Sequence, residues 1–544
     1  MAGINKAFYL FVYIVFFSGK LFGQDKHFIV YFKDKNNSPY SISNPSQYLS
    51  PKAIERRTRQ HISITENDLP VNPDYLDSLV AKGAQIVYPL KWLNAAAIIA
   101  DSMEMVNIST CSFVLGGNKL ARLMTTHRLI HQKNQKSKAK KSSASYGSSY
   151  NQVNMLQADI MHQDGFHGEG ILIALLDAGF KNAPSLSFTQ HLFTNNRILA
   201  TYDFVAGELN VYDDDPHGLE VLSVVGGYQQ DALIGTAYNA SFVLLRTEDT
   251  NSETETEEAY WARGAEYADS IGADILSSSL GYTTFDDATT NHTYSEFNGH
   301  TTIIARAADM AASKGMLVIC SAGNEGSDSW QYITTPADGD SLLAIGAVDA
   351  SSHYTYFSST GPSSDGRIKP DLAAQGSDVT IGTPGGSITT ASGTSFACPL
   401  TTGLAAGLWQ AFPTLTNMQL YNALKLSASQ YNRPDNFLGY GIPGYLKAKE
   451  YINDSIFNIG IDVRVFPNPI HEGGLVFTAG AEYFNQKVTI KMYDLLGRIV
   501  SESEVTVTAV RNEIPVNTAT LRDGVYVLRF YFPDKVVKTR IVKN

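Results

Sequence analysis

The sequence is poor in cysteine and in charge, and each shortage excludes a class of protein. Its three cysteines, Cys111, Cys320 and Cys398, cannot form a disulfide framework, and no Cys/His spacing matches a zinc site. Charged residues make up only 17% of the chain, and the net charge of −11 argues against the clustered lysine and arginine of a phosphate-binding surface. We therefore expect no nucleic acid partner, and a large core rather than disulfides as the source of stability.

Long apolar runs are also scarce. The run Phe8–Phe17 is short for a membrane span, Lys6 precedes it, and the small residues Ser18, Gly19 and Gly23 lie near the expected cut. This pattern predicts a signal peptide over residues 1–23, with an uncleaved membrane anchor as the alternative. No later segment is apolar enough to span a bilayer, so we expect a secreted or cell-surface protein with no stable membrane span in the mature form.

A chain of 544 residues is too long for one core, and its composition changes along its length. A stretch of almost purely polar residues, QKNQKSKAKKSSASYGSS, reads as a protease-accessible linker between two folded units. We predict four parts after the signal peptide: a propeptide-like domain at 24–131, a Lys/Ser-rich linker at 132–149, a large domain at 150–455 and a small domain at 460–544.

The large domain alternates between two patterns. Buried-strand runs alternate with helical periodicity, which predicts an α/β fold with a parallel sheet and helices on both of its faces. The strand runs are 171–176, 241–245, 316–320 and 342–348, and the helical patterns include 257–271 and 303–314. In such sheets, functional residues gather at the carboxyl ends of the strands.

The flanking domains differ from the large one. The first mixes strand runs at 27–32 and 95–100 with a helix at 75–82, which predicts a small α+β unit. After residue 460 the pattern becomes short strands separated by turn residues, which predicts a small all-β sandwich. Its strand runs are 488–493, 504–507, 525–532 and 536–542.

Two residues of the large domain could form an acid–base pair. Asp177 ends a buried strand run, where a carboxylate is costly unless it is paired. His217 follows Pro216 and opens a helical pattern that ends at Gly226, so its imidazole should project from a helix start. Taken singly, a structural ion pair and a surface histidine are the more ordinary interpretations.

Two further residues could supply a nucleophile and an oxyanion donor. Ser395 lies two residues after Gly393 and precedes a small-residue helix over 401–410, and a helix N-terminus favours developing negative charge. Asn324 follows a strand run, where its side-chain amide could donate to an oxyanion. An N-cap serine and a turn-forming asparagine are the alternatives.

Together these residues occur in the order Asp, His, Asn, Ser, and the order Asp…His…Ser is that of subtilisin. The flanking motifs make the large domain resemble a subtilase catalytic domain over its whole length. The matching motifs are LLDAGF, HGLEV, SSLG, SAGNEG, FSSTGPSSDGRIKPDLAAQG and GTSFACP. The resemblance implies a serine endopeptidase in which Asp177, His217 and Ser395 form the triad and Asn324 binds the oxyanion.

The resemblance implies more than the triad. It implies that the backbone of Ser279, Leu280 and Gly281 binds the substrate peptide beside the primary specificity pocket. It also shows two departures, because the family usually has Thr or Ser at Ala178 and a second His at Glu220.

The sequence excludes one other class of serine hydrolase and leaves one non-enzymatic class open. An α/β-hydrolase would need Gly-x-Ser-x-Gly and a later histidine, but position 397 is alanine, and the later His471 lies in another domain. The remaining alternative is a catalytically silent subtilase-like surface or adhesion protein. No cofactor is required by this chemistry. The acidic run 213–215 could hold structural calcium, but a solvated loop is the more ordinary interpretation. Cys398 is expected to be a buried small side chain and not a nucleophile.

The outer domains carry weaker resemblances. The first resembles a subtilase propeptide in place and size, with a substrate- or surface-binding module as the alternative. The last resembles the sorting domain of the type IX secretion system, with a generic carbohydrate- or protein-binding sandwich as the alternative. Its matching segments are Pro467–Pro469, Tyr493–Arg498, Gly524–Tyr526 and a basic end at Lys535–Lys543. The expected partners are therefore protein or peptide substrates and the type IX machinery, with export through the periplasm.

Overall fold

The computed structural model describes residues 26–115, 120–123, 145–457, 463–470, 475–479, 486–508, 511–532 and 536–543. Contacts divide the chain into two compact units, with the boundary between Ala448 and Lys449. The predicted signal peptide lies outside the described residues, as does most of the predicted linker. Within the described ranges, none of the helices combines the length and the apolar character that a bilayer span requires.

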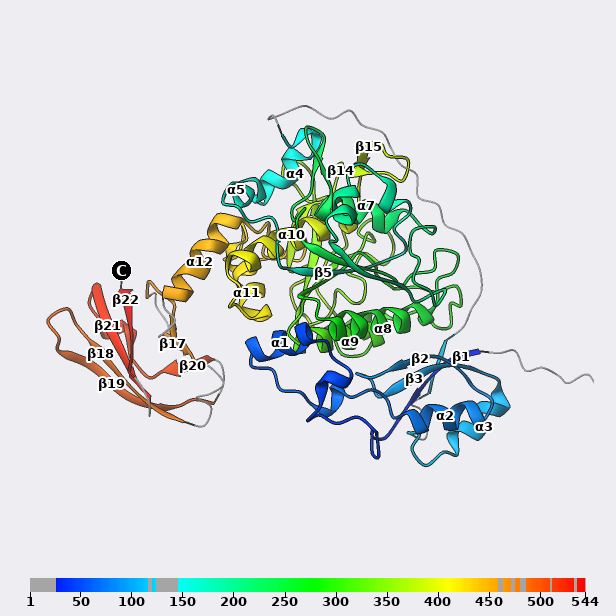
Figure 1. The fold of residues 1–544 in the computed structure, drawn as a ribbon. Coiled ribbons are helices and arrows are strands. Elements are labelled where there is room, and N and C mark those ends of the chain that lie inside the picture. The colour runs from blue at the N-terminus through cyan, green and yellow to red at the C-terminus, as the bar shows by residue number, and fades with distance from the viewer. Residues whose placement is uncertain are drawn as a thin grey trace, which may run out of the picture. The chain divides into compact units, whose positions relative to one another are not determined.

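A seven-stranded parallel sheet forms the centre of the first unit (Figure 1). Three of its strands are nearly continuous apolar runs that are buried on both faces, as is common in all-parallel sheets. In spatial order the seven strands are β13 (Leu372–Gln375), β12 (Leu342–Val348), β11 (Leu317–Ser321), β10 (Ile275–Ser278), β5 (Leu172–Asp177), β9 (Ser241–Arg246) and β6 (Ile198–Asp203). The predicted α/β fold class is confirmed.

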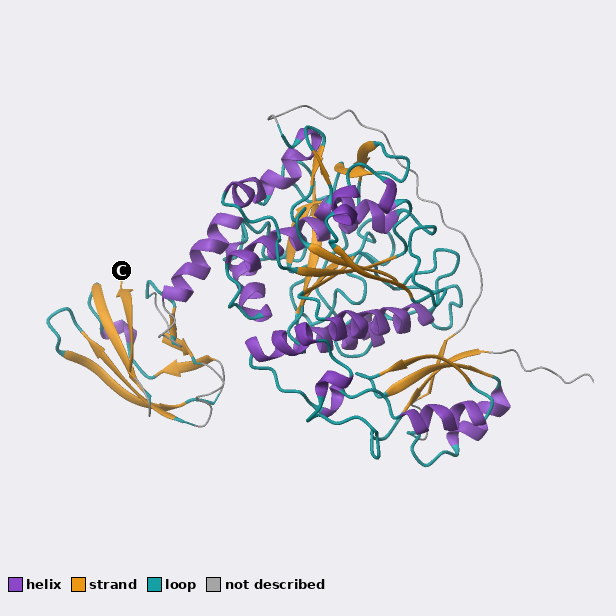
Figure 2. Cartoon of the chain, in the orientation of Figure 1, coloured by secondary structure: helices purple, strands orange, loops and turns teal. Residues whose placement is uncertain are grey.

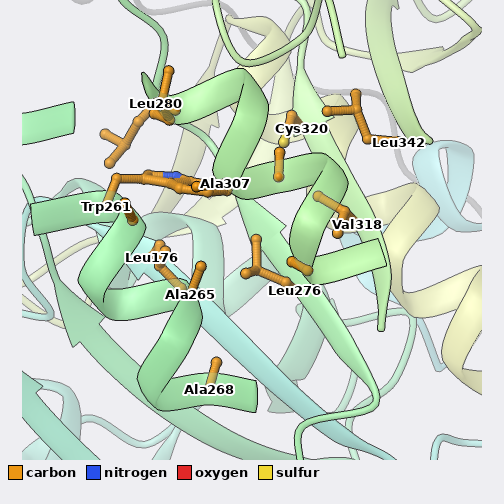
Figure 3. Close-up of a cluster of buried hydrophobic side chains, with 14 of the residues drawn as sticks. Leu176, Trp261, Ala265, Ala268, Leu276, Leu280, Ala307, Val318, Cys320 and Leu342 are labelled. Carbon is orange, nitrogen blue, oxygen red and sulfur yellow. The ribbon is translucent and has the colours of Figure 1, made fainter. Parts of the chain in front are cut away.

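Helices cover both faces of this sheet, as predicted (Figures 1 and 2). One face carries α8 (Glu255–Ile271) and α9 (Ile303–Ser313), and the other carries α7 (His217–Gly226) and α10 (Thr394–Ala411). Alanines on α8 and α9 allow these helices to approach the sheet closely. Figure 3 shows this core, in which Trp261, Ala265 and Ala268 of α8 face Leu176 of β5 and Leu276 of β10.

The strand order places one edge of the sheet at a topological switch point. The chain runs from β5 to the β6 and β9 side and then crosses to β10 on the other side of β5. All of these strands are parallel, so their carboxyl ends meet at one edge. In open α/β sheets, ligands bind in the crevice outside such a switch point.

The first domain is an antiparallel sheet in the order β2 (Gln85–Leu90), β3 (Ala95–Ala100), β1 (Lys26–Tyr31) and β4 (Leu120–Leu123). Successive residues along its strands point to opposite faces of the sheet and therefore enter two different cores. Val30, Ala96 and Ile98 pack in one core with α2 (Pro73–Ala81) and α3 (Ser102–Ser109). Ile29, Ala95 and Ala97 belong instead to the core of the central domain. The predicted α+β unit is therefore docked on α8 and α9.

Ion pairs reinforce this docking. Helix α1 (Pro51–Arg59) places Arg56 Nη2 2.5 Å and Arg57 Nη2 2.9 Å from Asp269 Oδ1 near the end of α8. Lys91 Nζ lies 3.1 Å from Asp269 Oδ2. Asp269 is fully buried, so the first domain supplies three cations to one carboxylate that water does not reach.

The linker prediction needs a correction at its end. Residues 147–149 form a 3-10 turn, and Ser149 is buried, donating a hydrogen bond from its hydroxyl to the carbonyl oxygen of Ile234. The hydroxyl finds buried partners there, so these residues belong to the central domain and not to a tether. Residues 132–144 lie outside the described residues.

The second unit contains two antiparallel sheets, as expected for a small sandwich. One has the order β16 (Arg464–Phe466), β17 (Leu475–Thr478) and β20 (Arg511–Ile514). The other has the order β19 (Ile499–Thr506), β18 (Lys487–Tyr493), β21 (Gly524–Tyr531) and β22 (Val536–Lys543). Along β18, buried residues alternate with more exposed ones. The buried residues Val488, Ile490 and Met492 pack in a hydrophobic core that belongs to the second unit.

The remaining elements belong to the first unit, except that α12 continues across its boundary. The helices are α4 (Tyr150–Met155), α5 (Ala158–Gln163), α6 (Gln190–Thr194), α11 (Asn417–Ser427) and α12 (Tyr445–Phe457). The strands are β7 (Tyr228–Gln229), β8 (Leu233–Ile234), β14 (Val379–Gly382) and β15 (Ile388–Ala391).

Candidate active site

Asp177 and His217 are brought together at the carboxyl edge of the sheet. Asp177 is the last residue of β5, and its Oδ1 accepts a hydrogen bond of 2.7 Å from Nδ1 of His217, the first residue of α7. The backbone N–H of Ala178 donates to the same oxygen at 2.8 Å. Because Nδ1 donates this hydrogen bond, it carries the proton of the neutral imidazole, and Nε2 is left as the basic nitrogen.

The local sequence explains how the helix start reaches the strand end. Asp215 accepts a hydrogen bond of 2.8 Å from the backbone N–H of His217, which satisfies a donor at the start of α7. Gly218 permits the close approach, because a Cβ there would lie 2.9 Å from Cβ of Asp177. The helix predicted over 217–226 is confirmed with the same bounds.

Ser395 lies in the first turn of α10, which begins earlier than the predicted helix at 401–410. Pro399 has no N–H to donate to the carbonyl oxygen of Ser395, and the hydroxyl of Ser279 donates to that oxygen instead, at 2.9 Å. The Ser395 hydroxyl in turn donates to the carbonyl oxygen of Ser279 at 3.3 Å. The structure therefore holds the predicted nucleophile against the segment that follows β10.

Asn324 is oriented by its neighbours. Its Oδ1 accepts hydrogen bonds from the backbone N–H of Thr394 at 2.9 Å and from the Thr394 hydroxyl at 3.1 Å. The oxygen is thereby assigned, and the amide Nδ2 remains as a donor. The preceding Gly323 has φ +106°, and a Cβ there would lie 2.6 Å from Cγ2 of Thr334, so this turn requires glycine.

One pocket of about 610 Å³ joins these groups. The predicted site residues that line it are His217, Ser279, Leu280, Gly281, Asn324 and Ser395. Asp177 lies behind His217 and is 1% exposed. The structure thus gathers every residue predicted for the site, although Ser395 and His217 are not joined by a hydrogen bond here. Catalytic hydrogen bonds are often loose before substrate binds.

The electrostatics of the site favour a charged imidazole. Burial lowers the pKa of His217, but the charge and hydrogen bond of Asp177, followed by the charges of Glu220 and Asp215, raise it to a net value of about 9. Burial raises the pKa of Glu220 to about 7, against the opposing effect of His217. The imidazolium is therefore stabilised when it forms, which suits a base that must hold a proton temporarily.

The two departures noted in the sequence have local consequences. Ala178 has no hydroxyl, and Oδ2 of Asp177 is buried with no hydrogen-bond partner among the described residues. Glu220 lies one helical turn after His217 and lines the pocket with a carboxylate.

Sequence reasoning missed other lining residues, namely Glu248, Glu253, Thr334 and Phe396. Glu248 and Glu253 follow β9, a strand that the sequence did predict. The rule that strand ends carry function, applied to this strand also, would have found them.

Cys398 is a buried side chain, as predicted. Its thiol lies 3.6 Å from the carbonyl oxygens of Ser278 and Ile319, and burial raises its pKa to about 12. It therefore stays protonated at neutral pH and is a poor nucleophile.

The acidic run 213–215 does not fit the calcium site considered for it. Asp213 accepts a hydrogen bond from Asn210, Asp214 lies 3.5 Å from Arg246, and Asp215 accepts from the backbone N–H of His217. Because the three carboxylates engage different protein partners, they do not converge on one point. Among the described residues, the groups of three carboxylates or histidines whose ligand atoms converge are His300–Asp309–Asp340 and Glu248–Glu253–Glu257.

A serine beside a carboxylate-oriented imidazole, at the carboxyl edge of a parallel sheet, defines a serine hydrolase site. Residues 168–441, half of the chain, match the Subtilase family. The chain therefore belongs to the subtilase family and is a serine endopeptidase.

The chain is similar to individual relatives and to a solved structure. Subtilisin E of Bacillus subtilis (strain 168) is 27% identical over 357 residues, which cover 65% of this chain and 80% of that protein. Subtilisin DY of Bacillus licheniformis is 28% identical over 287 residues, covering 52% and 92%. The crystal structure of MycP1 with the N-terminal propeptide removed has a TM-score of 0.44 and 23% identity, and covers 55% of this chain and 96% of that one.

The flanking domains also match known families. Residues 27–141 match the Peptidase S8 propeptide domain of Bacteroidota, and residues 464–544 match a secretion system C-terminal sorting domain. The endopeptidase is therefore made with a propeptide, and its type IX sorting domain directs it to the cell surface or the medium. The predicted resemblances of both outer domains are confirmed.

Proposed function

We propose that Ser395 is the nucleophile, His217 the general base, Asp177 the residue that orients the base, and Asn324 an oxyanion donor. The observation that carries this proposal is the 2.7 Å hydrogen bond between Asp177 and His217 beside a pocket that Ser395 also lines. The order of the sheet supports it, because Asp177 ends β5 and the segments bearing Ser279 and Asn324 follow β10 and β11.

The reaction then runs through an acyl-enzyme. The Ser395 hydroxyl turns from the carbonyl oxygen of Ser279 toward Nε2 of His217, gives up its proton and attacks the peptide carbonyl carbon. Nδ2 of Asn324 and the backbone N–H groups at the start of α10 stabilise the oxyanion. The protonated His217 then gives its proton to the leaving amine. Water repeats the sequence to release the acid and restore the hydroxyl.

We assign substrate binding to the backbone of Ser279, Leu280 and Gly281. This segment lines the pocket, and an extended peptide laid beside it would present its carbonyl carbon to Ser395. The reaction needs no cofactor in this assignment, because side chains supply every proton transfer. Calcium, if bound, would act on stability alone, so EDTA should leave kcat of the folded enzyme unchanged.

The domain boundaries complete the proposal. Residues 1–23 are removed as a signal peptide, 24–131 act as the propeptide, 147–455 as the peptidase and 460–544 as the sorting domain. Cleavage falls in the linker that follows the propeptide. The partners are protein or peptide substrates and the type IX machinery, with no nucleic acid and no membrane span in the mature enzyme.

Ser395→Ala tests the central assignment. Hydrolysis of casein should fall by about 10⁶-fold, because triad members act as a unit, while the far-UV spectrum and Tm stay unchanged. The matched control is Ser351→Ala, which removes an exposed hydroxyl outside the pocket. Activity of the Ser395 variant within tenfold of wild type would refute the assignment.

The same variant tests maturation. Made without other proteases, the Ser395→Ala protein should retain residues 24 to about 145, as read by N-terminal sequencing and intact mass. Normal trimming in that setting would show that another agent processes the chain.

A further inference from the structure

The charged groups around the active-site pocket carry one sign. Apart from His217, the charged side chains that line it are all acidic: Asp215, Glu220, Glu248, Glu253 and Glu325. No lysine or arginine is among the described residues that line it. A pocket lined by one sign of charge raises the local concentration of ligands of the opposite sign.

Two of these carboxylates stand close together without a cation. Carboxylate oxygens of Glu248, Glu253 and Glu257 all lie within 4.8 Å of one another. Glu257 is committed to structure, since it accepts hydrogen bonds from the backbone N–H groups of Thr254 and Asp249. Glu248 accepts one hydrogen bond of 2.6 Å from the Tyr282 hydroxyl. Among the described residues, no cationic side chain forms an ion pair with Glu248 or Glu253.

This arrangement is costly in the free enzyme. Burial and the neighbouring charges of Glu248, Asp286 and Glu325 raise the pKa of Glu253 to about 9. Burial raises the pKa of Glu248 to about 7, against the hydrogen bond from Tyr282. A cation placed between the two carboxylates would offset both the burial and the mutual repulsion.

A second observation also points to a ligand. The Thr334 side chain lines the same pocket and is 1% exposed, and its hydroxyl has no hydrogen-bond partner among the described residues. The hydroxyl faces Gly281, at a position that a Cβ on that glycine would clash with. Buried hydroxyls without a partner are rare, and this one is available to accept a hydrogen bond from a group that enters the pocket.

We propose that the enzyme prefers peptides with a lysine or arginine side chain on the amino-terminal side of the cleaved bond, and that Glu248 and Glu253 receive the cation. This inference rests on the proposed function, and it adds a substrate class to the same site. Both glutamates lie on the loop after β9, next to β5, whose last residue is Asp177.

The chain itself contains a segment of matching charge. Between Gln132 and Ser149 the sequence has five lysines, at positions 133, 136, 138, 140 and 141, and no acidic residue. The propeptide match ends at residue 141, at the last of these lysines. The preference therefore identifies a first substrate, the enzyme's own linker, and places the maturation cut after one of these lysines.

A peptide series tests the preference on the mature wild-type enzyme. Lys, Arg, norleucine or Glu is placed in turn at each of the three positions before a fluorogenic leaving group, and kcat/KM is measured. At one position, kcat/KM for the Lys and Arg peptides should exceed that for the norleucine peptide by at least about tenfold, because a partly buried charge pair contributes that much or more. Norleucine has the length of lysine without its charge, so equal values for the two would overturn the proposal.

Substitutions at the two glutamates test where the cationic side chain of the substrate binds. In Glu253→Gln and Glu248→Gln, kcat/KM for the Lys and Arg peptides should fall by about tenfold to a hundredfold, while that for the norleucine peptide stays within about threefold. The matched control is Glu208→Gln, which removes one exposed carboxylate outside the pocket. Equal losses for charged and neutral peptides would contradict the proposal.

A metal ion is the competing occupant. Calcium is titrated calorimetrically into wild type and Glu253→Gln after EDTA treatment. Calcium binding that the variant loses, together with no preference for cationic peptides, would overturn the proposal in favour of a metal site. Failure to cleave any peptide would defeat the proposed function, and this inference with it. Cleavage of neutral peptides without a cationic preference would defeat this inference alone.

Discussion

The two ends of helix α8 present carboxylates in opposite states. Asp269, near its carboxyl end, is surrounded by Arg56, Arg57 and Lys91 of the propeptide domain. At its amino end, Glu253 and Glu257 lie close to Glu248 with no cation among the described residues. Burial raises the pKa of Asp269, but Lys91, Arg56 and Arg57 together bring it well below its usual range, whereas the pKa of Glu253 is raised to about 9.

The difference indicates that the carboxylate at one end of α8 serves stability and that those at the other end serve substrate recognition. At the carboxyl end of a helix the dipole disfavours an anion, so Asp269 depends on the cations that the propeptide supplies. It loses them when the propeptide leaves. At the amino end the acidic groups belong to the cleft, and a substrate would have to bring the cation. The same helix therefore holds the propeptide at one end and borders the substrate pocket at the other.

Removing the charge of Asp269, at the end of α8 where the carboxylate is paired, should have the largest effect on stability. In the Ser395→Ala chain, which keeps its propeptide, Asp269→Asn should lower the free energy of unfolding by about 3–5 kcal/mol, because it leaves buried cations without their partner. Urea unfolding, with hydrogen exchange of α1 as a second readout, measures it. The control Asp365→Asn breaks an exposed pair with Arg367 and should change stability much less.

The sign of the pH dependence follows from the lowered pKa of Asp269. Its stabilising effect is present above the ordinary carboxyl range near 4 and is lost as the pH falls below it. An Asp269→Asn variant as stable as its parent at pH 7 would contradict the pairing.

Removing a donor from the cleft should affect the rate and leave the propeptide interface intact. Asn324→Ala should lower kcat by roughly 10²–10³ with little change in KM, because the amide would act on the transition-state oxyanion. Asn324→Asp keeps the acceptor for Thr394 but loses the donor, so it should be similarly slow. A change confined to KM would show that Asn324 only positions substrate.

The acidic cleft should shift the pH profile of the enzyme. The ordinary imidazole pKa predicts a midpoint near 7, but the raised pKa of His217 moves the expected midpoint of kcat/KM to about 9. Below it, the rate should rise about tenfold per pH unit, because only the neutral imidazole acts as base. Glu220→Gln should lower the midpoint, and the control Glu208→Gln should not. A profile flat from pH 5 to 9, with chemistry rate-limiting, would contradict the role of His217.

Removing the sorting domain should have the smallest effect, because neither end of α8 belongs to it. A chain ending near residue 458 should fold, mature and cleave peptides as the full chain does, yet fail to reach the surface or medium in its host. Fusing residues 460–544 to a fluorescent protein with a signal peptide is the complementary test. Normal export of the shortened enzyme, or lost activity in a folded protein, would contradict this division.

Much of this fold could be predicted because several of its strands are buried on both faces and therefore read as continuous apolar runs. The runs at 171–176 and 342–348 became β5 and β12 almost unchanged. Strand β10 was missed because its four residues, ILSS, are half polar. Their serines are buried by tertiary contacts, such as the hydrogen bond from Trp261 to Ser278, which a local pattern does not contain.

The site was predictable for a different reason. Its residues stand in short motifs at strand ends and helix starts, so Asp177, His217, Asn324 and Ser395 could be named from their neighbours. The glutamates of the cleft were missed because Glu248 and Glu253 have no motif, and their position after β9 was the one signal that pointed to them. The three cations around Asp269 come from two separate segments of the propeptide, α1 and the residues after β2, so no local pattern in the sequence indicates their pairing.

The central claim is that this cleft is a working serine endopeptidase site, and one labelling experiment tests it most directly. The mature protein is treated with a fluorophosphonate probe, digested and mapped by mass spectrometry. We predict one probe per molecule on Ser395, with none on the Ser395→Ala protein and sharply reduced labelling of His217→Ala. A folded wild-type protein that takes up no probe, or takes it up at another residue, would contradict the account.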